Sequence, residues 1–177
     1  MGLDMYIYKK RYLYNVKDVE LKINNKIVDV VNLNNLVFEE VYWYWSEEVY
    51  WRKVNAVHGW FVSNIQDGND DCKEYYVSTN DFIKLVEDCK KDLEYFKTLD
   101  YDIKIETNKH TITRSYKIYK NVDESELNLN LIEGFFFGNN EYDSDYVEDL
   151  EDTIEKIETL LSKEDYACYD YYYQSSW

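Results

Sequence analysis

The sequence has no proline among its 177 residues, and it contains only five glycines, two histidines and three arginines. A zinc site needs about four cysteine, histidine or acidic ligands at short spacings, and Cys72, Cys89 and Cys168 form no C-x-x-C pair. We therefore expect no metal ion and no cofactor. The signatures G-x-S-x-G, G-x-x-x-x-G-K-[ST], G-x-G-x-x-G and H-E-x-x-H are also absent. Catalysis thus stays open but is not favoured by any motif.

Extracellular and membrane features are lacking too. An odd number of scattered cysteines, without a recognisable secretion signal, indicates reduced thiols and predicts a cytoplasmic protein. No apolar run approaches the roughly 20 residues of a membrane-spanning helix.

Positive charge is scarce as well. The formal net charge is −16, and residues 121–165 alone carry 15 acids and 2 lysines. Direct binding to nucleic acid or to an anionic membrane is disfavoured by this balance. A basic protein partner is compatible with it.

Hydrophobic periodicity predicts an α+β fold, in a single domain over residues 1–177, with a mostly antiparallel sheet packed against about three helices. The order of elements is not a regular β-α alternation. We expect strands or hairpins at Gly2–Lys10, Glu20–Val31, Leu36–Tyr44, Tyr75–Val77, Asp102–Tyr119 and Tyr166–Trp177, and helices at Glu47–Gln66, at about 79–97 and at Asp143–Lys163.

The segment Glu47–Gln66 is expected to be the organising helix, with Ser46 as its N-cap and two acids in its first turn. A core stripe runs along it at helical spacing. The stripe comprises Tyr50, Val54, Val57, Phe61 and Ile65.

The other side of this predicted helix is unusual for a solvated surface, because it combines aromatic, basic and amide side chains. Gly59 costs about 1 kcal/mol relative to alanine in a helix interior, and one reason to accept that cost is the close approach of another group. Two interpretations remain open: a ligand site, or side chains covered by another element of the same domain. The residues concerned are Trp51, Arg52, Asn55 and His58.

Three further segments carry local signals. Ser78 and Asp81 are spaced as a capping box, and Asp67–Asp71 only partly matches a calcium loop, so we interpret it as a turn. The aromatic cluster 42–45 is too bulky for an ordinary surface. An acidic ridge on the third helix indicates a solvated face or a mimic of nucleic acid; it comprises Asp145, Glu148, Asp149, Asp152 and Glu155.

The run Phe135–Gly138 places three phenylalanines between Gly134 and Gly138. It fits a buried strand whose glycines allow close packing. It also fits the apolar wall of a ligand pocket.

Four stretches resemble a family of small proteins encoded by bacteriophages, prophages and bacteria. They are MGLDMY at the start, Tyr50–Val62 in the centre, FFFG followed by Tyr142, and the terminal QSSW. The resemblance spans the chain and implies no particular activity. It implies a mobile-element setting, in the cytoplasm of a host cell, where small acidic proteins often counter host defence.

These observations leave four hypotheses. The first is a binding protein that sequesters a small nucleotide-type signalling ligand through aromatic stacking, basic phosphate contacts and an amide. The others are an acidic DNA mimic that inhibits a host protein, a small nucleotide hydrolase with His58 as its base, and a homo-oligomer. The predicted ligand-binding residues are Trp51, Arg52, Asn55, His58, Phe135, Phe137 and Tyr142.

Overall fold

The computed structural model describes residues 2–12, 18–23, 26–32, 43–108, 111–134 and 137–177, with side chains placed for 2–11, 45–107, 113–134 and 137–177. Antiparallel strands and three α-helices make up this described part of the chain. The predicted α+β class, a mostly antiparallel sheet packed against about three helices, is therefore confirmed.

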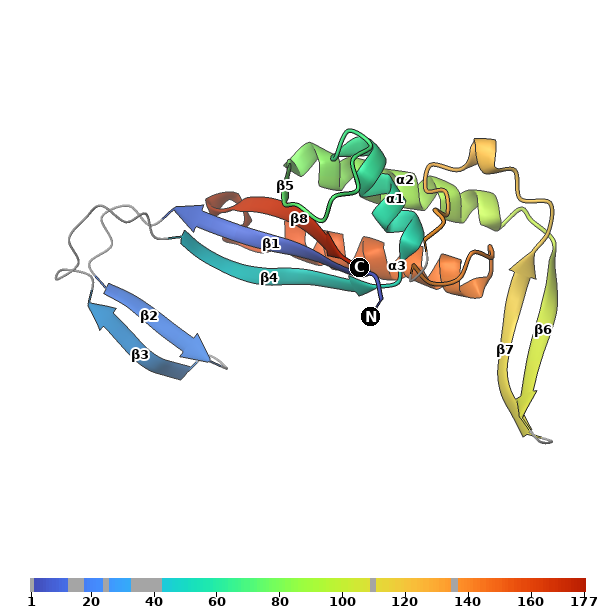
Figure 1. Cartoon of the computed structure of the whole chain (residues 1–177), viewed down its shortest axis with the longest axis horizontal. Coiled ribbons are helices and arrows are strands. Elements are labelled where there is room, and N and C mark those ends of the chain that lie inside the picture. Colours follow the sequence, from blue (N-terminus) through green and yellow to red (C-terminus); the bar gives the residue numbers. More distant parts are fainter. Residues whose placement is uncertain (1, 13–17, 24–25, 33–42, 109–110, 135–136) are drawn as a thin grey trace.

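The main sheet has the strand order β4-β1-β8-β5, with antiparallel neighbours throughout (Figure 1). Its first and last strands in sequence lie side by side, because Asp4 pairs with Ser176 and Lys10 pairs with Asp170. The strands predicted near residues 2–10, 75–77 and 166–177 are confirmed. Their bounds are Asp4–Tyr12 for β1, Trp43–Arg52 for β4, Tyr75–Val77 for β5 and Asp170–Ser176 for β8, which follows a short 3-10 turn, η3, at Tyr166–Cys168.

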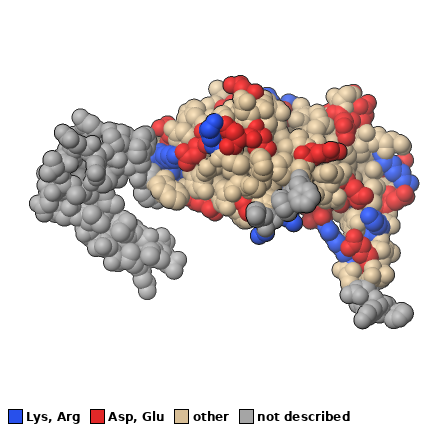
Figure 2. Space-filling model, viewed as in Figure 1, with Lys and Arg blue, Asp and Glu red and all other residues tan. Residues whose placement is uncertain are grey.

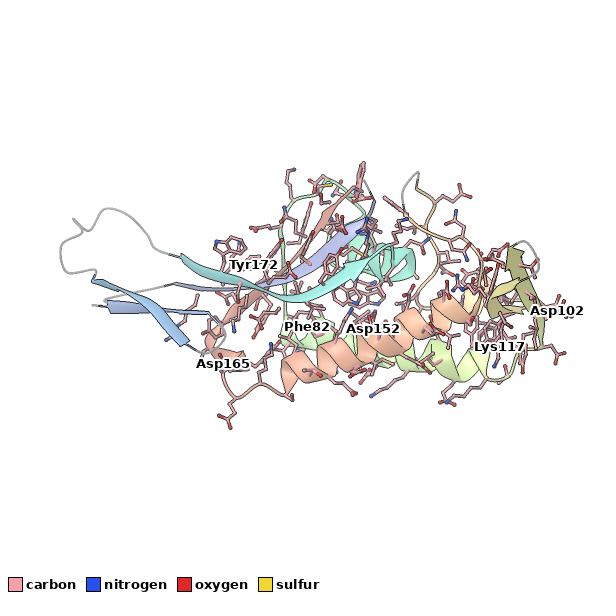
Figure 3. The ribbon with its side chains drawn as sticks, turned by 90° about the horizontal axis from the view of Figure 1, so that it is seen from below. Phe82, Asp102, Lys117, Asp152, Asp165 and Tyr172 are labelled. Carbon is pink, nitrogen blue, oxygen red and sulfur yellow. The ribbon has the colours of Figure 1, made fainter. Side chains whose placement is uncertain are left out.

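Alternating side chains give this sheet two unlike faces. Met5 and Ile7 of β1 and Tyr173 of β8 are fully buried on one face. The helices α2 and α3 lie along that face (Figure 3). Tyr6 and Tyr8 of β1 point to the opposite face, which no described helix covers.

Helix α2, Thr79–Phe96, begins at the predicted capping box. The Asp81 backbone N–H donates to the Ser78 hydroxyl at 3.2 Å, and the Ser78 N–H donates to the Asp81 carboxylate at 2.9 Å. Cys89 is fully buried on the apolar side of this helix, and burial raises the pKa of its thiol. It is therefore an unreactive core residue.

Helix α3, Ser144–Leu161, packs against α2 and has Asp143 as its N-cap. The predicted acidic ridge is not the continuous solvated face that we expected. Arg114 binds Asp145, Lys156 binds Asp152 at 2.6 Å, and Asp149 is half-buried.

The predicted helix Glu47–Gln66 is wrong in its first half. Residues up to Arg52 form β4, and α1 covers only Asn55–Asn64. The run Val49–Trp51 is apolar throughout and therefore fits both structures: a helix would bury Tyr50, whereas the strand buries Val49 and Trp51 at alternate positions. Pairing with β1 decides between them, since it satisfies the backbone hydrogen bonds along the whole segment.

Three details of that prediction change with it. Ser46 is not an N-cap, because its hydroxyl donates to the Glu48 carboxylate at 2.6 Å within β4. Glu47 and Glu48 complement no helix dipole. Tyr50 is 37% exposed and leaves the core stripe. The remaining stripe residues, Val54, Val57 and Phe61, are buried as expected, and Ile65 packs against them.

Two hairpins are confirmed: β2, Asp18–Ile23, with β3, Lys26–Asn32, and β6, Tyr101–Asn108, with β7, Thr111–Tyr119. The strand predicted at Leu36–Tyr44 lies outside the described residues except for 43–44, which begin β4. The prediction that the aromatic cluster 42–45 avoids the surface is wrong at Trp45, whose side chain is 63% exposed.

In the view of Figure 2, acidic side chains spread over the body and several Lys and Arg side chains gather over the β6–β7 hairpin.

The chain between β7 and α3 is irregular, apart from the 3-10 turn η2 at Glu124–Glu126. It buries Leu127 and Leu129 against the helices. This segment explains Gly59 of α1: a Cβ there would lie 2.8 Å from Cγ2 of Ile132 and 3.3 Å from the Asn130 carbonyl. The close approach that we predicted is made by the chain itself.

Candidate functional site

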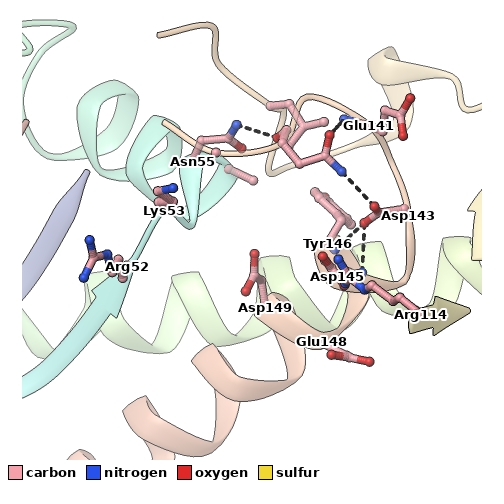
Figure 4. Close-up of a pocket in the computed structure, with 14 residues that line it drawn as sticks. Arg52, Lys53, Asn55, Arg114, Glu141, Asp143, Asp145, Tyr146, Glu148 and Asp149 are labelled. Atoms are coloured by element: carbon pink, nitrogen blue, oxygen red, sulfur yellow. Dashed lines mark hydrogen bonds and ion pairs between the residues drawn. The ribbon is translucent and has the colours of Figure 1, made fainter. Parts of the chain in front are cut away.

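A cleft of about 730 Å³ opens between the β4–α1 turn and the first half of α3 (Figure 4). Its volume lies in the usual range for small-molecule sites. One wall is basic and the other is acidic. The lining residues are Arg52, Lys53, Asn55, Ala56, Arg114, Leu131, Gly138, Asn139, Glu141, Asp143, Asp145, Tyr146, Glu148 and Asp149.

The basic wall comes from the end of β4. Arg52 is the last residue of the strand, and its Nε lies 3.8 Å from the Asp4 carboxylate, which is too long for a strong ion pair. Lys53 follows in the left-handed region at φ 61°, and its N–H donates to the Leu3 carbonyl at 2.8 Å. Among the described residues, no ion pair neutralises Lys53. Both cations therefore remain able to bind an anion.

Gly138 holds this turn in place from the other side. Its φ is +110°, and a Cβ at this position would lie 2.6 Å from the Lys53 carbonyl oxygen. Only a glycine permits both that conformation and that approach. Asn55 also links the start of α1 to the segment after Gly138, because its Nδ2 donates to the Asn139 carbonyl at 2.9 Å and to Asn140 Oδ1 at 3.1 Å.

The acidic wall comes from the first turns of α3. Asp143 Oδ1 accepts the backbone N–H groups of Asp145, at 2.8 Å, and Tyr146, at 3.2 Å. Its other oxygen accepts Nδ2 of Asn139 at 2.7 Å. Asp143 is thus fully used in capping the helix, and burial raises the pKa of its carboxyl.

Asp149 is the acid that projects into the cleft, below Lys53 and Asn55 (Figure 4). Burial, followed by repulsion from Asp145 and Asp152, raises its pKa to about 7. Near neutral pH the side chain is therefore half protonated, so that it can donate a hydrogen bond as well as accept one.

Replacing Asp149 with asparagine is expected to stabilise the protein at pH 8 by about 1–2 kcal/mol, after discounting for solvent screening. The folded-state pKa of about 7 lies above the ordinary value of 3.8. The wild type therefore loses stability as the pH rises from 3.8 to about 7, and the uncharged amide of the variant avoids that loss. Urea unfolding of both proteins should give nearly equal stabilities at pH 4. Glu155→Gln, at an exposed position on the same helix that does not contribute to the raised pKa of Asp149, should show no such gain.

Of the seven predicted ligand-binding residues, Arg52 and Asn55 line this cleft. Trp51 does not, because it is 1% exposed and its Nε1 donates to the Thr153 hydroxyl at 3.1 Å. Here the alternative interpretation is confirmed: another element of the fold, α3, covers the indole.

His58 is also inside the fold, with no exposed surface. Its Nε2 lies 3.1 Å from Asp70 Oδ2 and its Nδ1 lies 2.7 Å from the Tyr173 hydroxyl. An ionised carboxylate only accepts hydrogen bonds, so Nε2 carries the proton and Nδ1 accepts from the tyrosine. Burial lowers the pKa of His58 despite the opposing effect of Asp70.

The aromatic residues of the second predicted motif pack inside as well. Phe137 is 7% exposed and meets His58 edge to face at 5.1 Å. Tyr142 is half-buried, and its hydroxyl accepts the Leu131 N–H at 3.3 Å. Phe135 lies outside the described residues. The terminal Trp177 is 49% exposed, and its Nε1 donates to Asp70 at 3.1 Å.

Of the residues that line the cleft, the sequence indicates Lys53 as a phosphate contact beside Arg52, but it does not indicate Arg114 or Gly138. The acids of α3 were noted as a ridge, but their approach to Arg52 depends on how α3 packs against β4, and no pattern encodes that.

Among the described residues, no group of three or more His, Cys, Asp or Glu side chains could hold a metal ion. The Asp67–Asp71 segment forms a turn, in which Asp71 binds Lys73 at 2.6 Å. Each described helix is too short or too polar to span a membrane.

Comparisons with models of protein families, with curated proteins and with solved structures found no match. The resemblance to phage and bacterial proteins therefore stays a prediction from the four sequence stretches that carry it.

Proposed function

We propose that this protein binds a small ligand in the cleft, with an anionic group at Arg52 and Lys53 and a hydroxyl or amino group at Asp149. One observation carries the proposal: Arg52 and Lys53, which have no close ion-pair partner among the described residues, line the same open cleft of about 730 Å³ as Asp149, whose pKa is raised to about 7. A ligand with both kinds of group satisfies both walls.

A nucleotide is the ligand class that we propose. Arginine and lysine bind phosphate oxygens through charge-assisted hydrogen bonds, and a carboxyl group commonly binds ribose hydroxyls. The raised pKa of Asp149 reduces the repulsion that a phosphate would meet in an acidic protein. With Trp51, His58 and Phe137 buried, recognition would depend on polar contacts rather than on aromatic stacking. The biological role that we propose is sequestration of a nucleotide signal.

The acidic decoy is the less favoured alternative. A mimic of DNA needs an uninterrupted negative surface. Arg114 and Lys156 neutralise two of the ridge acids, and Asp149 is half protonated near pH 7.

Calorimetric titration with cyclic dinucleotides and ADP-ribose derivatives tests the proposal. We expect at least one of them to bind, and the double variant Arg52→Ala, Lys53→Ala to bind it at least tenfold more weakly, since about 1.4 kcal/mol corresponds to a factor of ten. Lys97→Ala, at the exposed C-cap residue of α2, is the matched control and should leave the affinity unchanged. The proposal fails if the folded wild type binds none of these compounds.

A separate variant distinguishes the acidic decoy from ligand binding in the cleft. Neutralising Asp145, Glu148 and Asp152 together, with Asp149 left in place, should abolish salt-sensitive binding to a basic host protein if the acids are the interface. If this variant keeps its biological activity while Arg52→Ala loses it, the cleft is the functional site.

A further inference from the structure

The open face of the main sheet is covered with aromatic side chains, although no described element packs on it. Directly paired residues of antiparallel strands share a face, which places Tyr6 opposite Tyr50 and Tyr8 opposite Tyr172. Tyr172 in turn pairs with Tyr76 of β5. Figure 3 shows Tyr172 at the sheet and Phe82 between the sheet and the helices.

A second groove, of about 410 Å³, lies on this face, and it shares no lining residue with the first cleft. It is lined by Tyr8, Lys10, Trp45, Glu74, Tyr172 and Gln174. Residues from four different segments of the chain therefore meet there.

Trp45 forms one side of the groove and is 63% exposed. Tyr8 meets its ring edge to face, at 5.6 Å between centroids and 80° between planes. This arrangement supports the indole from one side and leaves a broad aromatic surface facing the groove. Such exposure of the largest apolar side chain is typical of a contact surface for a ligand.

The polar side of the groove is electrically balanced. Lys10 forms an ion pair with Glu74, and its Nζ lies 4.7 Å from the centre of the Tyr172 ring. Gln174 donates its Nε2 to the Cys72 carbonyl at 3.0 Å, which orients the amide. The groove thus offers an ammonium, a carboxylate and an amide, and no net charge.

We infer that this groove binds a neutral oligosaccharide, with one sugar ring stacked on Trp45. The faces of aromatic rings are negative, so they attract the positive C–H groups on the flat side of a pyranose ring. Carboxylate and amide groups bind pairs of hydroxyls, and Lys10 supplies a donor. A purely apolar ligand would remove the Lys10–Glu74 ion pair from water without adding a hydrogen bond to it, and a polyanion would meet the charge of −16.

Tryptophan fluorescence titration with neutral hexasaccharides of glucose, mannose and N-acetylglucosamine tests the inference. We expect at least one of the three to bind the wild type, Trp45→Ala to weaken it at least tenfold, and Trp45→Tyr to restore part of the affinity. Because Trp45→Ala lacks the indole that reports binding, sugar binding by this variant is measured by calorimetry. Ile103→Ala is the matched control, because Ile103 is 64% exposed on the distant β6–β7 hairpin.

Three results would overturn the inference. They are no binding of any of the three sugars, equal binding by Trp45→Ala, and a concentration-dependent dimer in light scattering that Trp45→Ala dissociates. The last would assign this face to a second copy of the chain. Arg52→Ala, Lys53→Ala should leave sugar binding unchanged, so that failure of the nucleotide proposal and failure of this one can be told apart.

Discussion

Replacing Asp92 with alanine is expected to destabilise the protein by about 3–5 kcal/mol, which is the effect of leaving buried polar groups without their charged partner. Asp92 is fully buried on α2. Three donors point at its carboxylate: the Asn128 N–H at 2.9 Å, Asn128 Nδ2 at 2.7 Å and the Leu129 N–H at 2.8 Å. The Tyr146 hydroxyl lies 3.2 Å from the same carboxylate and 2.7 Å from the Leu129 carbonyl, and its one proton is shared between them. These bonds fasten the irregular chain after β7 to both α2 and α3.

Chemical denaturation monitored by circular dichroism measures this loss. The control is Glu94→Ala, two residues further along α2, where the side chain is 72% exposed and forms an ion pair with the exposed Lys97. We expect a change of about 0.5 kcal/mol or less there. Equal effects at the two positions would show that the segment at 127–131 is held by apolar burial and not by Asp92.

Replacing Gly138 with alanine is expected to cost about 2–4 kcal/mol, from backbone strain at φ +110° together with the clash against the Lys53 carbonyl at 2.6 Å. Relief of the clash requires the β4–α1 turn to move. We therefore expect ligand binding in the cleft to weaken along with stability.

Gly68 provides the matched control. Its φ is +78°, which is also unfavourable for alanine, but no atom lies within 4 Å of the position a Cβ would occupy. Gly68→Ala should cost only about 1 kcal/mol. Thermal unfolding of the two variants separates the contribution of strain from that of the clash, and similar losses would contradict a close contact between Gly138 and Lys53.

The accuracy of the sequence predictions depends on how local each signal is. The capping box at Ser78 and Asp81 and the alternation along β1 are encoded within a few residues, and both are confirmed. The prediction for Glu47–Gln66 failed because Val49, Tyr50 and Trp51 are all apolar, so that the run fits a strand that buries Val49 and Trp51 as well as a helix that buries Tyr50. Pairing with β1, which lies far upstream in the sequence, decides the outcome, and periodicity within the segment contains no information about that partner.

The candidate site shows the same difference between local signals, which can be predicted, and contacts with distant segments, which cannot. The side chains of Trp51 and His58 looked functional because they are unusual on a helix surface. They are instead buried and bonded to Thr153, Asp70 and Tyr173, which lie outside the segment that was interpreted as a helix. Arg52 and Asn55 do reach the cleft, but its acidic wall was interpreted as a solvated ridge. The raised pKa of Asp149 arises from packing, and no local pattern predicts it.

The most direct test of the cleft is heteronuclear NMR mapping of backbone amides during titration with the tightest nucleotide found by calorimetry. If the cleft is the binding site, shifts will concentrate at residues 52–55, 137–140 and 145–149. Shifts confined to the groove around Trp45 and Tyr172, or no shifts at saturating ligand, would contradict it.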